Sequence, residues 1–268
     1  MGVDVAEGHG HCFNCDWRKR RVAVSELKKK LSLGEWVVLE KVSKRRMAPL
    51  RLPEDYNLLY SRVKGDYWQD KAYAYLKKRG VTDRQIKRYK IGITETGPYA
   101  YRVVIPVYVE GKLEGLVCRA LKSDQDPKYK NSMGDKGVWG LHTDAETCVL
   151  VEGVFDALAC DRAVGDVRDC RAILGHSLTG RQLDMLDGYK EYILWPDPDK
   201  AGVQGFSIIA EQLSEMGKVS MVVPYLNNID KDPSEQTDAE IQIRIKRRKS
   251  WSQQLNNRLQ AWLLYRED

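Results

Sequence analysis

The sequence predicts an α/β fold: a parallel sheet flanked by helices, preceded by a smaller basic α+β subdomain. After about residue 146, short apolar segments alternate with helical patterns, which is typical of a parallel sheet covered by helices on both faces. Before that point we expect short helices and a β-hairpin without this alternation. Charge divides at the same place, because residues 1–146 carry a net charge of +10 and residues 147–268 carry −4.

Five segments can be distinguished by composition and pattern. The first is rich in Gly, His and Cys; the second is basic, and we expect a helix followed by a linker. The third is the basic subdomain, the fourth carries the strand–helix alternation, and the fifth is a helical tail. Their boundaries are expected at residues 1–21, 22–54, 55–146, 147–236 and 237–268.

Two helices and a hairpin are expected in the basic subdomain. The stretch DKAYAYLKKRGVTDRQIKRYKIGI, residues 70–93, breaks at Gly80, a residue suited to the left-handed conformation that ends many helices. Thr82 is suited to the N-cap of the second helix. In residues 101–121, the letters EGK between two apolar runs indicate a hairpin turn. A looser basic loop is expected to follow.

Strands and helices are expected in turn through the back half. The strands are 147–153, 171–177, 192–197 and 218–225, and the helices are 154–164, 178–189 and 201–217. Parallel strands bring their carboxyl ends to one edge of the sheet, where the functional residues of such folds gather.

Acidic residues follow these strands. Glu152 directly follows VLV at the end of the first strand, Asp197 and Asp199 follow ILW at the end of the third, and Asp232 lies a few residues past the fourth. Carboxylates that meet at one edge repel each other unless a positive group lies between them. Oxygen ligands without His or Cys favour a hard cation, Mg²⁺ or Mn²⁺. Each motif alone is usually a turn, but their shared position after parallel strands favours a metal site.

Composition excludes several classes of protein. Hydrophobic residues make up 43% and charged residues 31% of the chain, as in ordinary globular proteins. The sequence contains no apolar run long enough for a membrane span and no secretory signal pattern, so we expect a cytoplasmic protein with no membrane partner. Of the six cysteines, the four after residue 100 are expected to be reduced.

The motifs VLVEGVFDALA, YILWPDPDKAG and KDPSE resemble the Toprim domain of primases, topoisomerases and some nucleases. Further forward, LKKRGVTDRQIKRYKIGI, RVVIPV, GKLEGLVCRAL, PKYKNS and GVWGL resemble the RNA-polymerase domain of bacterial and phage DnaG-type DNA primases. The match covers about residues 72–236. The resemblance implies a nucleotidyltransferase that synthesises short RNA primers on single-stranded DNA from ribonucleoside triphosphates.

The resemblance also implies roles for the acidic residues. Glu152, Asp197 and Asp199 match the positions that hold the metal ions. Asp156 and Asp232 match further acidic positions, which either bind metal through water or orient Lys200 and Lys231. No His or Tyr occupies an obvious general-base position, so the metals are expected to activate the attacking 3′-hydroxyl.

Basic residues of the front half match the family's contacts to nucleotide and template. Arg119 and Lys128 match motif positions, Lys136 matches with looser spacing, and Arg102 is a weaker candidate of the same kind. Such side chains could hold the triphosphate and the template backbone; the alternative is a solvated loop. His176 is either catalytic or, more simply, a hydrogen-bonded turn residue.

The stretch HGHCFNCDW resembles the second half of the family's zinc ribbon. Cys12 and Cys15 have the spacing of one knuckle, whereas the preceding knuckle would lie upstream of residue 1. Since structural zinc needs four ligands, we expect a partial ribbon remnant, and whether Zn²⁺ binds stays open.

Two alternative functions are kept: a Toprim-fold nuclease, and an inactive single-stranded-DNA-binding replication module. A topoisomerase would need a further tyrosine domain. The sequence contains no P-loop, so we expect no helicase domain in it. The tail has one apolar stripe that could dock on a separate helicase: Trp251, Leu255, Leu259, Trp262 and Leu263. A compact primase of this kind would suit a phage or mobile element.

Overall fold

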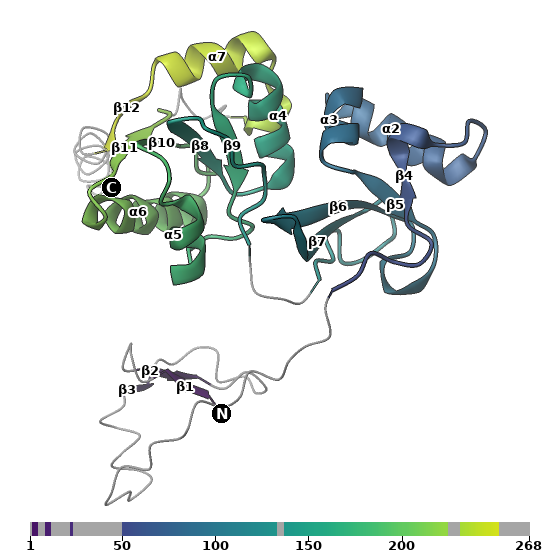
Figure 1. Ribbon diagram of the computed structural model, residues 1–268, viewed down its shortest axis with the longest axis horizontal. Helices are drawn as coiled ribbons and strands as arrows, with labels where there is room; N and C mark the ends of the chain where they lie inside the picture. The colour runs from purple at the N-terminus through teal and green to yellow at the C-terminus, as the bar shows by residue number, and fades with distance from the viewer. Residues whose placement is uncertain are drawn as a thin grey trace, which may run out of the picture. The chain divides into compact units, whose positions relative to one another are not determined.

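The computed structural model describes residues 2–4, 9–11, 22–23, 50–132, 137–224 and 231–251. The chain divides into two compact units, Met1–Ala48 and Pro49–Asp268, and each is described by itself. Figure 1 shows the helices and strands of both.

The first unit contains a small antiparallel sheet of order β1-β2-β3. Its strands are β1 (Gly2–Asp4), β2 (His9–His11) and β3 (Val22–Ala23). The helix expected from about Val22 is therefore wrong at its start, because Val22–Ala23 pairs with β2 as a strand. Cys12 and Cys15 lie outside the described residues.

The front of the second unit is a four-stranded antiparallel sheet of order β4-β5-β6-β7 with two helices. The strands are β4 (Asn57–Leu58), β5 (Gly92–Thr94), β6 (Arg102–Val109) and β7 (Lys112–Ala120). The helices are α2 (Tyr67–Lys78) and α3 (Asp83–Arg88), and two short 3-10 turns are η2 (Leu59–Ser61) and η3 (Gly97–Tyr99).

Local signals explain where these elements begin and end. Gly80 adopts φ +74° just after α2, as expected for a left-handed helix terminus. Thr82 caps α3, and its hydroxyl and the Gln85 side chain form a reciprocal capping box. Glu110 and Gly111 both have positive φ values, 48° and 76°, which suits the tight turn between β6 and β7. These three expectations are confirmed.

The back of the second unit is a five-stranded sheet of order β12-β11-β10-β8-β9. Strands β8 (Thr147–Val151), β9 (Asp169–Ala172), β10 (Glu191–Leu194) and β11 (Val219–Val222) pair in parallel. The connecting helices are α4 (Val154–Val164), α5 (Gly180–Leu186) and α6 (Lys200–Glu215). The expected α/β class and parallel sheet are confirmed. Strand β9 begins and ends earlier than the expected 171–177.

The end of the described chain differs from the expected helical tail. After the turn η4 (Pro233–Glu235), helix α7 (Asp238–Lys246) does form. Strand β12 (Lys249–Ser250) then pairs antiparallel with β11 at the edge of the sheet. The side chain of Trp251 packs against the core. The other members of the expected tail stripe, Leu255, Leu259, Trp262 and Leu263, lie outside the described residues.

Apolar residues on the two faces of the parallel sheet pack into separate clusters. Val149, Val151 and Ile193 face α4 and α7, whereas Leu150 and Leu194 face α5 and α6. Both faces are therefore covered, which agrees with the near-continuous apolar strands. The cluster that includes α4 also contains residues of α2, α3, β6 and β7, so the front subdomain and the α/β domain share one core.

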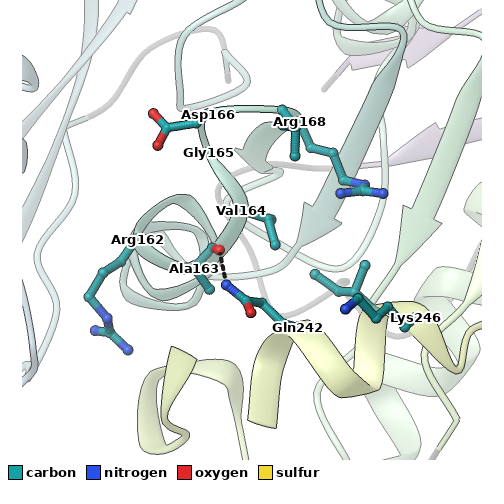
Figure 2. Close-up of a pocket in the computed structure, with 10 residues that line it drawn as sticks. Arg162, Ala163, Val164, Gly165, Asp166, Arg168, Gln242 and Lys246 are labelled. Carbon is teal, nitrogen blue, oxygen red and sulfur yellow. Dashed lines mark hydrogen bonds between the residues drawn. The ribbon is translucent and has the colours of Figure 1, made fainter. Parts of the chain in front are cut away.

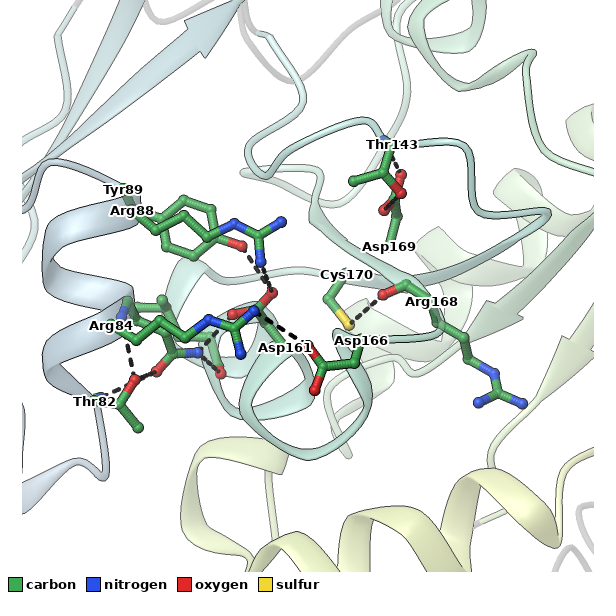
Figure 3. A network of polar contacts seen from close by, with 12 residues as sticks. Thr82, Arg84, Arg88, Tyr89, Thr143, Asp161, Asp166, Arg168, Asp169 and Cys170 are labelled. Atoms are coloured by element: carbon green, nitrogen blue, oxygen red, sulfur yellow. Dashed lines mark hydrogen bonds and ion pairs between the residues drawn. The ribbon is translucent and has the colours of Figure 1, made fainter.

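A buried polar network joins the same two subdomains (Figure 3). Asp161, near the end of α4, accepts hydrogen bonds from Gln85 Nε2 at 2.8 Å and from the Tyr89 hydroxyl at 2.9 Å. Arg88 lies 3.8 Å from the same carboxylate. These contacts tie α3 to α4, the helix that begins two residues after Glu152.

The cysteines and the helices of the described residues also bear on the expectations from the sequence. Cys118, Cys148, Cys160 and Cys170 are free and buried, in agreement with the expected reduced state. Among the described helices, none has the length and apolar character needed to cross a membrane.

Candidate functional site: an acidic cluster at the ends of β8 and β10

The acidic residues meet at the carboxyl edge of the parallel sheet. Strands β8 and β10 are neighbours, with Leu150 opposite Leu194, so the residues that follow them emerge side by side. Glu152 follows β8, and Asp197 follows β10. The backbone amide of Asp197 donates a hydrogen bond to Glu152 Oε1 at 3.3 Å. The expected convergence of these two acids is therefore present.

Gly202 makes this close approach possible. A Cβ atom at residue 202 would lie 2.5 Å from Glu152 Oε1 and 2.7 Å from the Asp197 carbonyl oxygen. Only glycine leaves that space free for the Glu152 carboxylate.

Asp199 and Asp156 are held by backbone amides. Asp199 is the N-cap of α6, and its Oδ1 accepts a hydrogen bond from the Gly202 amide at 2.7 Å. Asp156 lies in the first turn of α4, and its Oδ1 accepts from the Ser234 amide at 3.2 Å. The second bond ties the segment that carries Asp232 to α4.

Burial and mutual repulsion raise the pKa values of four of the clustered acids. Burial, followed by the charges of Glu152, Asp156, Asp232 and Asp199, raises the pKa of Asp197 to about 7. Burial and the charge of Asp232 raise the pKa of Asp156 to about 6. Burial raises the pKa of Glu152 and that of Asp232 as well, and the nearby Asp199 adds to both shifts. All five carboxyl groups thus belong to one electrostatic cluster.

His176 touches this cluster. Its Nδ1 lies 2.8 Å from Glu152 Oε2, and its side chain is 64% exposed. The residue stands in the loop between β9 and α5. The contact agrees with both expected roles, because a hydrogen-bonded loop residue and a catalytic residue could each touch Glu152.

The chemistry of the cluster fits a hard divalent cation. Its five acids offer carboxylate oxygens, which hard divalent cations prefer as ligands. Burial, followed by repulsion from neighbouring acids, raises the pKa values of Glu152, Asp156, Asp197 and Asp232, and a bound cation would favour their charged forms. Within the described ranges, however, no group of three or more His, Cys, Asp or Glu side chains is arranged to hold a metal ion as it stands. Glu152 faces His176 and Asp199 caps a helix, so binding would require these side chains to turn.

Arg119 lies beside Tyr129, a residue that senses one acid of the cluster. Its guanidinium carbon is 4.7 Å from the centre of the Tyr129 ring. Burial is the main cause that raises the pKa of Tyr129, and Asp156 contributes to the same rise. Tyr129 therefore lies within electrostatic range of both Arg119 and Asp156. The front subdomain thus brings a cation toward the acidic edge.

The other basic candidates are placed differently. Arg102 is 2% exposed and donates from a guanidinium nitrogen to the Lys128 carbonyl oxygen at 3.3 Å. Lys128 and Lys231 are exposed. Lys136 and the side chain of Lys200 lie outside the described residues.

Sequence reasoning missed the residues that hold the Asp232 segment in place. Arg162 donates to the Gly80 carbonyl oxygen at 3.0 Å and to the Gln236 carbonyl oxygen at 3.2 Å, and it also pairs with Asp238. The Gln236 side chain in turn donates to the Lys231 carbonyl oxygen at 2.6 Å. A single arginine in a helix carries no sequence signal for such a role.

A cavity of about 310 Å³ lies elsewhere, between the end of α4 and α7 (Figure 2). Gln242 Nε2 closes one side by donating to the Ala163 carbonyl oxygen at 2.8 Å. None of the five clustered acids lines this cavity. We therefore assign the candidate site to the acidic edge and not to the cavity.

Comparison with known families agrees with this assignment. Residues 149–237 match the Toprim-like family model. These residues form a Toprim domain. The match includes Glu152, Asp197 and Asp199, together with the segment that contains Asp232.

Similar proteins and structures are primases. The chain is 25% identical to a DNA primase of Helicobacter pylori, over 86% of this chain and 51% of the relative. It is 24% identical to a DNA primase of Legionella pneumophila, over 72% of this chain and 43% of the relative. The chain thus spans about half the length of the curated relatives it matches.

Solved structures show the same fold. A DnaG primase catalytic domain bound to single-stranded DNA superposes with a TM-score of 0.62 at 21% identity, over 73% of this chain and 77% of that one. The catalytic core of the Escherichia coli primase gives a TM-score of 0.61 at 21% identity, over 72% and 78%. The Toprim domain and the basic subdomain together have the fold of a DnaG-type primase catalytic core.

Proposed function

We propose that this protein is a DNA primase, which joins ribonucleotides into short RNA primers on a single-stranded DNA template. The observation that carries the proposal is the contact between Glu152 and the Asp197 amide, at 3.3 Å, at the edge of a Toprim sheet. This contact holds the acids that follow β8 and β10 at one edge of the sheet, where metal-dependent nucleotidyl transfer would use them. The primase relatives and the DnaG-type fold support the same reaction.

Glu152, Asp197 and Asp199 would hold the Mg²⁺ or Mn²⁺ ions. A bound divalent ion would neutralise phosphate charge and lower the pKa of the primer 3′-hydroxyl. The roles of Asp156 and Asp232 stay open: each either binds metal through water or positions neighbouring lysines. The Ser234 amide already occupies one oxygen of Asp156, which favours positioning for that residue.

The basic subdomain would hold the substrates. Arg119 is well placed for the triphosphate, since Tyr129 links it electrostatically to Asp156. Lys128, Lys136 and Lys200 stay proposed contacts to nucleotide or template, and Lys231 stays a proposed catalytic residue. Arg102 would act indirectly, because it is buried and holds the Lys128 backbone.

The remaining expectations are also proposals. Cys12 and Cys15 would contribute to a Zn²⁺ site if further ligands are available. A separate replicative helicase would be the protein partner. The segments 1–21, 22–54, 55–146, 147–236 and 237–268 would be the functional divisions, and the compact unit that begins at Pro49 starts near the third of them.

Primer synthesis tests the proposal directly. The protein is incubated with single-stranded DNA of mixed sequence, labelled ribonucleoside triphosphates and Mg²⁺ or Mn²⁺. We expect labelled oligoribonucleotides from the wild type, and a loss of about 100-fold or more in Asp197→Asn, since groups that stabilise transition-state charge have effects of this size. Asp184→Asn on α5, at an exposed acid, is the matched control and should retain activity.

Two results would overturn the proposal in favour of the alternatives. Metal-dependent cleavage of the DNA without primer synthesis would identify a Toprim nuclease. DNA binding without either reaction, under both metals, would identify a binding module. A parallel reaction with deoxyribonucleoside triphosphates determines which sugar is used.

A further inference from the structure

Aromatic rings and lysines gather at one end of the front sheet, where β6 begins and β7 ends. We call this surface the Trp68 platform, and it consists of Tyr67, Trp68, Lys71, Tyr101 and Lys122. The Trp68 and Tyr101 ring centroids are 4.6 Å apart, and those of Tyr67 and Trp68 are 5.0 Å apart. The Lys122 ammonium lies 3.4 Å from the Tyr101 centroid, and the Lys71 ammonium lies 4.9 Å from that of Trp68.

The platform is open to solvent. Tyr67 is 67% exposed, and Trp68 and Tyr101 are partly exposed. In the part of the chain that the structure describes, neither Lys71 nor Lys122 forms an ion pair with an acid. Both ammonium groups rest on ring faces, which at exposed sites is a weak attraction. They can therefore turn to a phosphate without breaking a salt bridge.

Tyr101 is held in an unusual backbone conformation. Its φ is +56°, in the left-handed region that a bulky residue with a Cβ rarely adopts. Two backbone hydrogen bonds fix it there, from the Tyr101 amide to Thr94 at 2.8 Å and from the Leu121 amide to Tyr101 at 3.1 Å. Backbone strain of this kind clusters at functional sites, where the surrounding structure holds it in place.

The platform lies at the end of the strand pair that carries Arg119. Arg119 is linked through Tyr129 to Asp156, as described above. Lys122 follows Arg119 by three residues and lies just past the end of β7. Trp68 packs against the core cluster that contains Val103 and Val117, and Val103 is the β6 partner of Arg119. Arg119 and the platform thus belong to the same side of the sheet.

We propose that the Trp68 platform is a second contact site for single-stranded DNA, in which bases stack on Tyr67 and Trp68 while Lys71 and Lys122 bind the flanking phosphates. Every base offers a flat face to an aromatic ring, so such surfaces bind single strands without sequence preference. Paired bases in a duplex are already stacked and cannot use the rings. The inference rests on the proposed function for the identity of the strand, the template that leaves the acidic cluster.

Equilibrium binding of a labelled single-stranded oligonucleotide, measured by fluorescence anisotropy in EDTA, tests the platform without primer synthesis. Trp68→Leu keeps an apolar side chain against the core but removes the large ring. We expect Kd to rise about tenfold in Trp68→Leu and in Tyr67→Ala, the usual effect of losing one stacked base. Since Tyr67 is exposed, its variant keeps the test valid if Trp68→Leu lowers stability. The double variant Lys71→Gln/Lys122→Gln loses two phosphate contacts. The negative slope of log K against log salt concentration should therefore become shallower by about 1.4.

The chain offers a matched control. Tyr108 and Lys90 form the same kind of pair, with the ammonium 4.9 Å from the ring centroid, near the other end of β6. Tyr108→Leu and Lys90→Gln should bind the oligonucleotide like the wild type. Equal affinity of the platform variants and these controls would overturn the inference. An equal loss of affinity for duplex DNA would also overturn it, because stacking would then play no part. If the wild type makes no primers but its DNA affinity depends on the platform, the primase proposal fails and the platform stands.

Discussion

The carboxylate of Glu152 and the backbone amide of Asp197 are joined by a hydrogen bond of 3.3 Å across two neighbouring parallel strands. This bond brings together the ends of β8 and β10, and with them the acids that follow each strand. The site therefore depends on the register of the sheet and on the space left by Gly202, as much as on the acids themselves.

Gly202→Ala should damage the site by displacing Glu152. The added methyl group would meet Glu152 Oε1 at 2.5 Å and the Asp197 carbonyl oxygen at 2.7 Å. We expect a loss of at least tenfold in primer synthesis and about 1–3 kcal/mol of stability, the usual range for overpacking. Gly180→Ala, at the first residue of α5, is the control, since its Cβ would meet nothing within 4 Å. Equal activity of the two variants would show that the close approach at Gly202 is unimportant.

Asp197→Asn should stabilise the metal-free protein at neutral and alkaline pH. The pKa of Asp197 is raised to about 7 in the fold, above its ordinary value of 3.8. The folded state therefore binds the proton more tightly than the unfolded state, and stability falls as pH rises from about 4 to about 7. Asparagine removes this penalty. At pH 8 in EDTA we expect Tm to rise by about 2–4 °C, equivalent to about 1 kcal/mol.

The pH dependence of this gain is the sharper part of that test. The difference in Tm between Asp197→Asn and the wild type should shrink as pH falls from 7 toward 4. A gain that is the same at pH 5 and pH 8, or a loss at pH 8, would mean that burial and repulsion of the Asp197 carboxylate do not lower the stability of the edge.

Arg162→Met should loosen the Asp232 segment and the join between the subdomains. The guanidinium bonds to Gly80, Gln236 and Asp238, and the methionine chain fills much of its volume without these bonds. We expect a loss of about 2–3 kcal/mol in urea unfolding, because hydrogen bonds of charged groups each contribute about 1.5–3 kcal/mol.

The control for Arg162 is an exposed ion pair at the same junction. Arg84 lies 3.2 Å from Asp166, and their side chains are 72% and 81% exposed. Such surface pairs contribute about 0–1 kcal/mol, so Arg84→Met should change stability little. If both variants lose the same stability, Arg162 has no special part in holding the segment.

The elements that could be predicted from the sequence are those with local signals. Gly80, Thr82 and Glu110–Gly111 mark ends and turns through backbone conformation and capping, which act over a few residues. After residue 146, short apolar segments alternate with helical patterns, and this local alternation indicates the α/β class. The acidic edge followed from it, since parallel strands bring Glu152 and Asp197 to one side.

What the sequence did not predict depends on contacts between distant segments. Strand β12 is only two polar residues, Lys249–Ser250, and is defined by its pairing with β11. The contact of His176 with Glu152 needs the loop after β9 to reach β8. Arg162 joins three segments that are far apart along the chain. None of these relations leaves a periodic or compositional trace.

Direct titration of the metal-free protein with Mn²⁺ tests the central claim, that Glu152, Asp197 and Asp199 form one divalent-cation site. Bound Mn²⁺ is counted by loss of the free-ion electron paramagnetic resonance signal, for the wild type, Glu152→Gln, Asp197→Asn and the Asp184→Asn control. We predict at least tenfold weaker Mn²⁺ binding in each of the first two variants and wild-type binding in the control. Unchanged Mn²⁺ affinity in Glu152→Gln and Asp197→Asn would contradict the account.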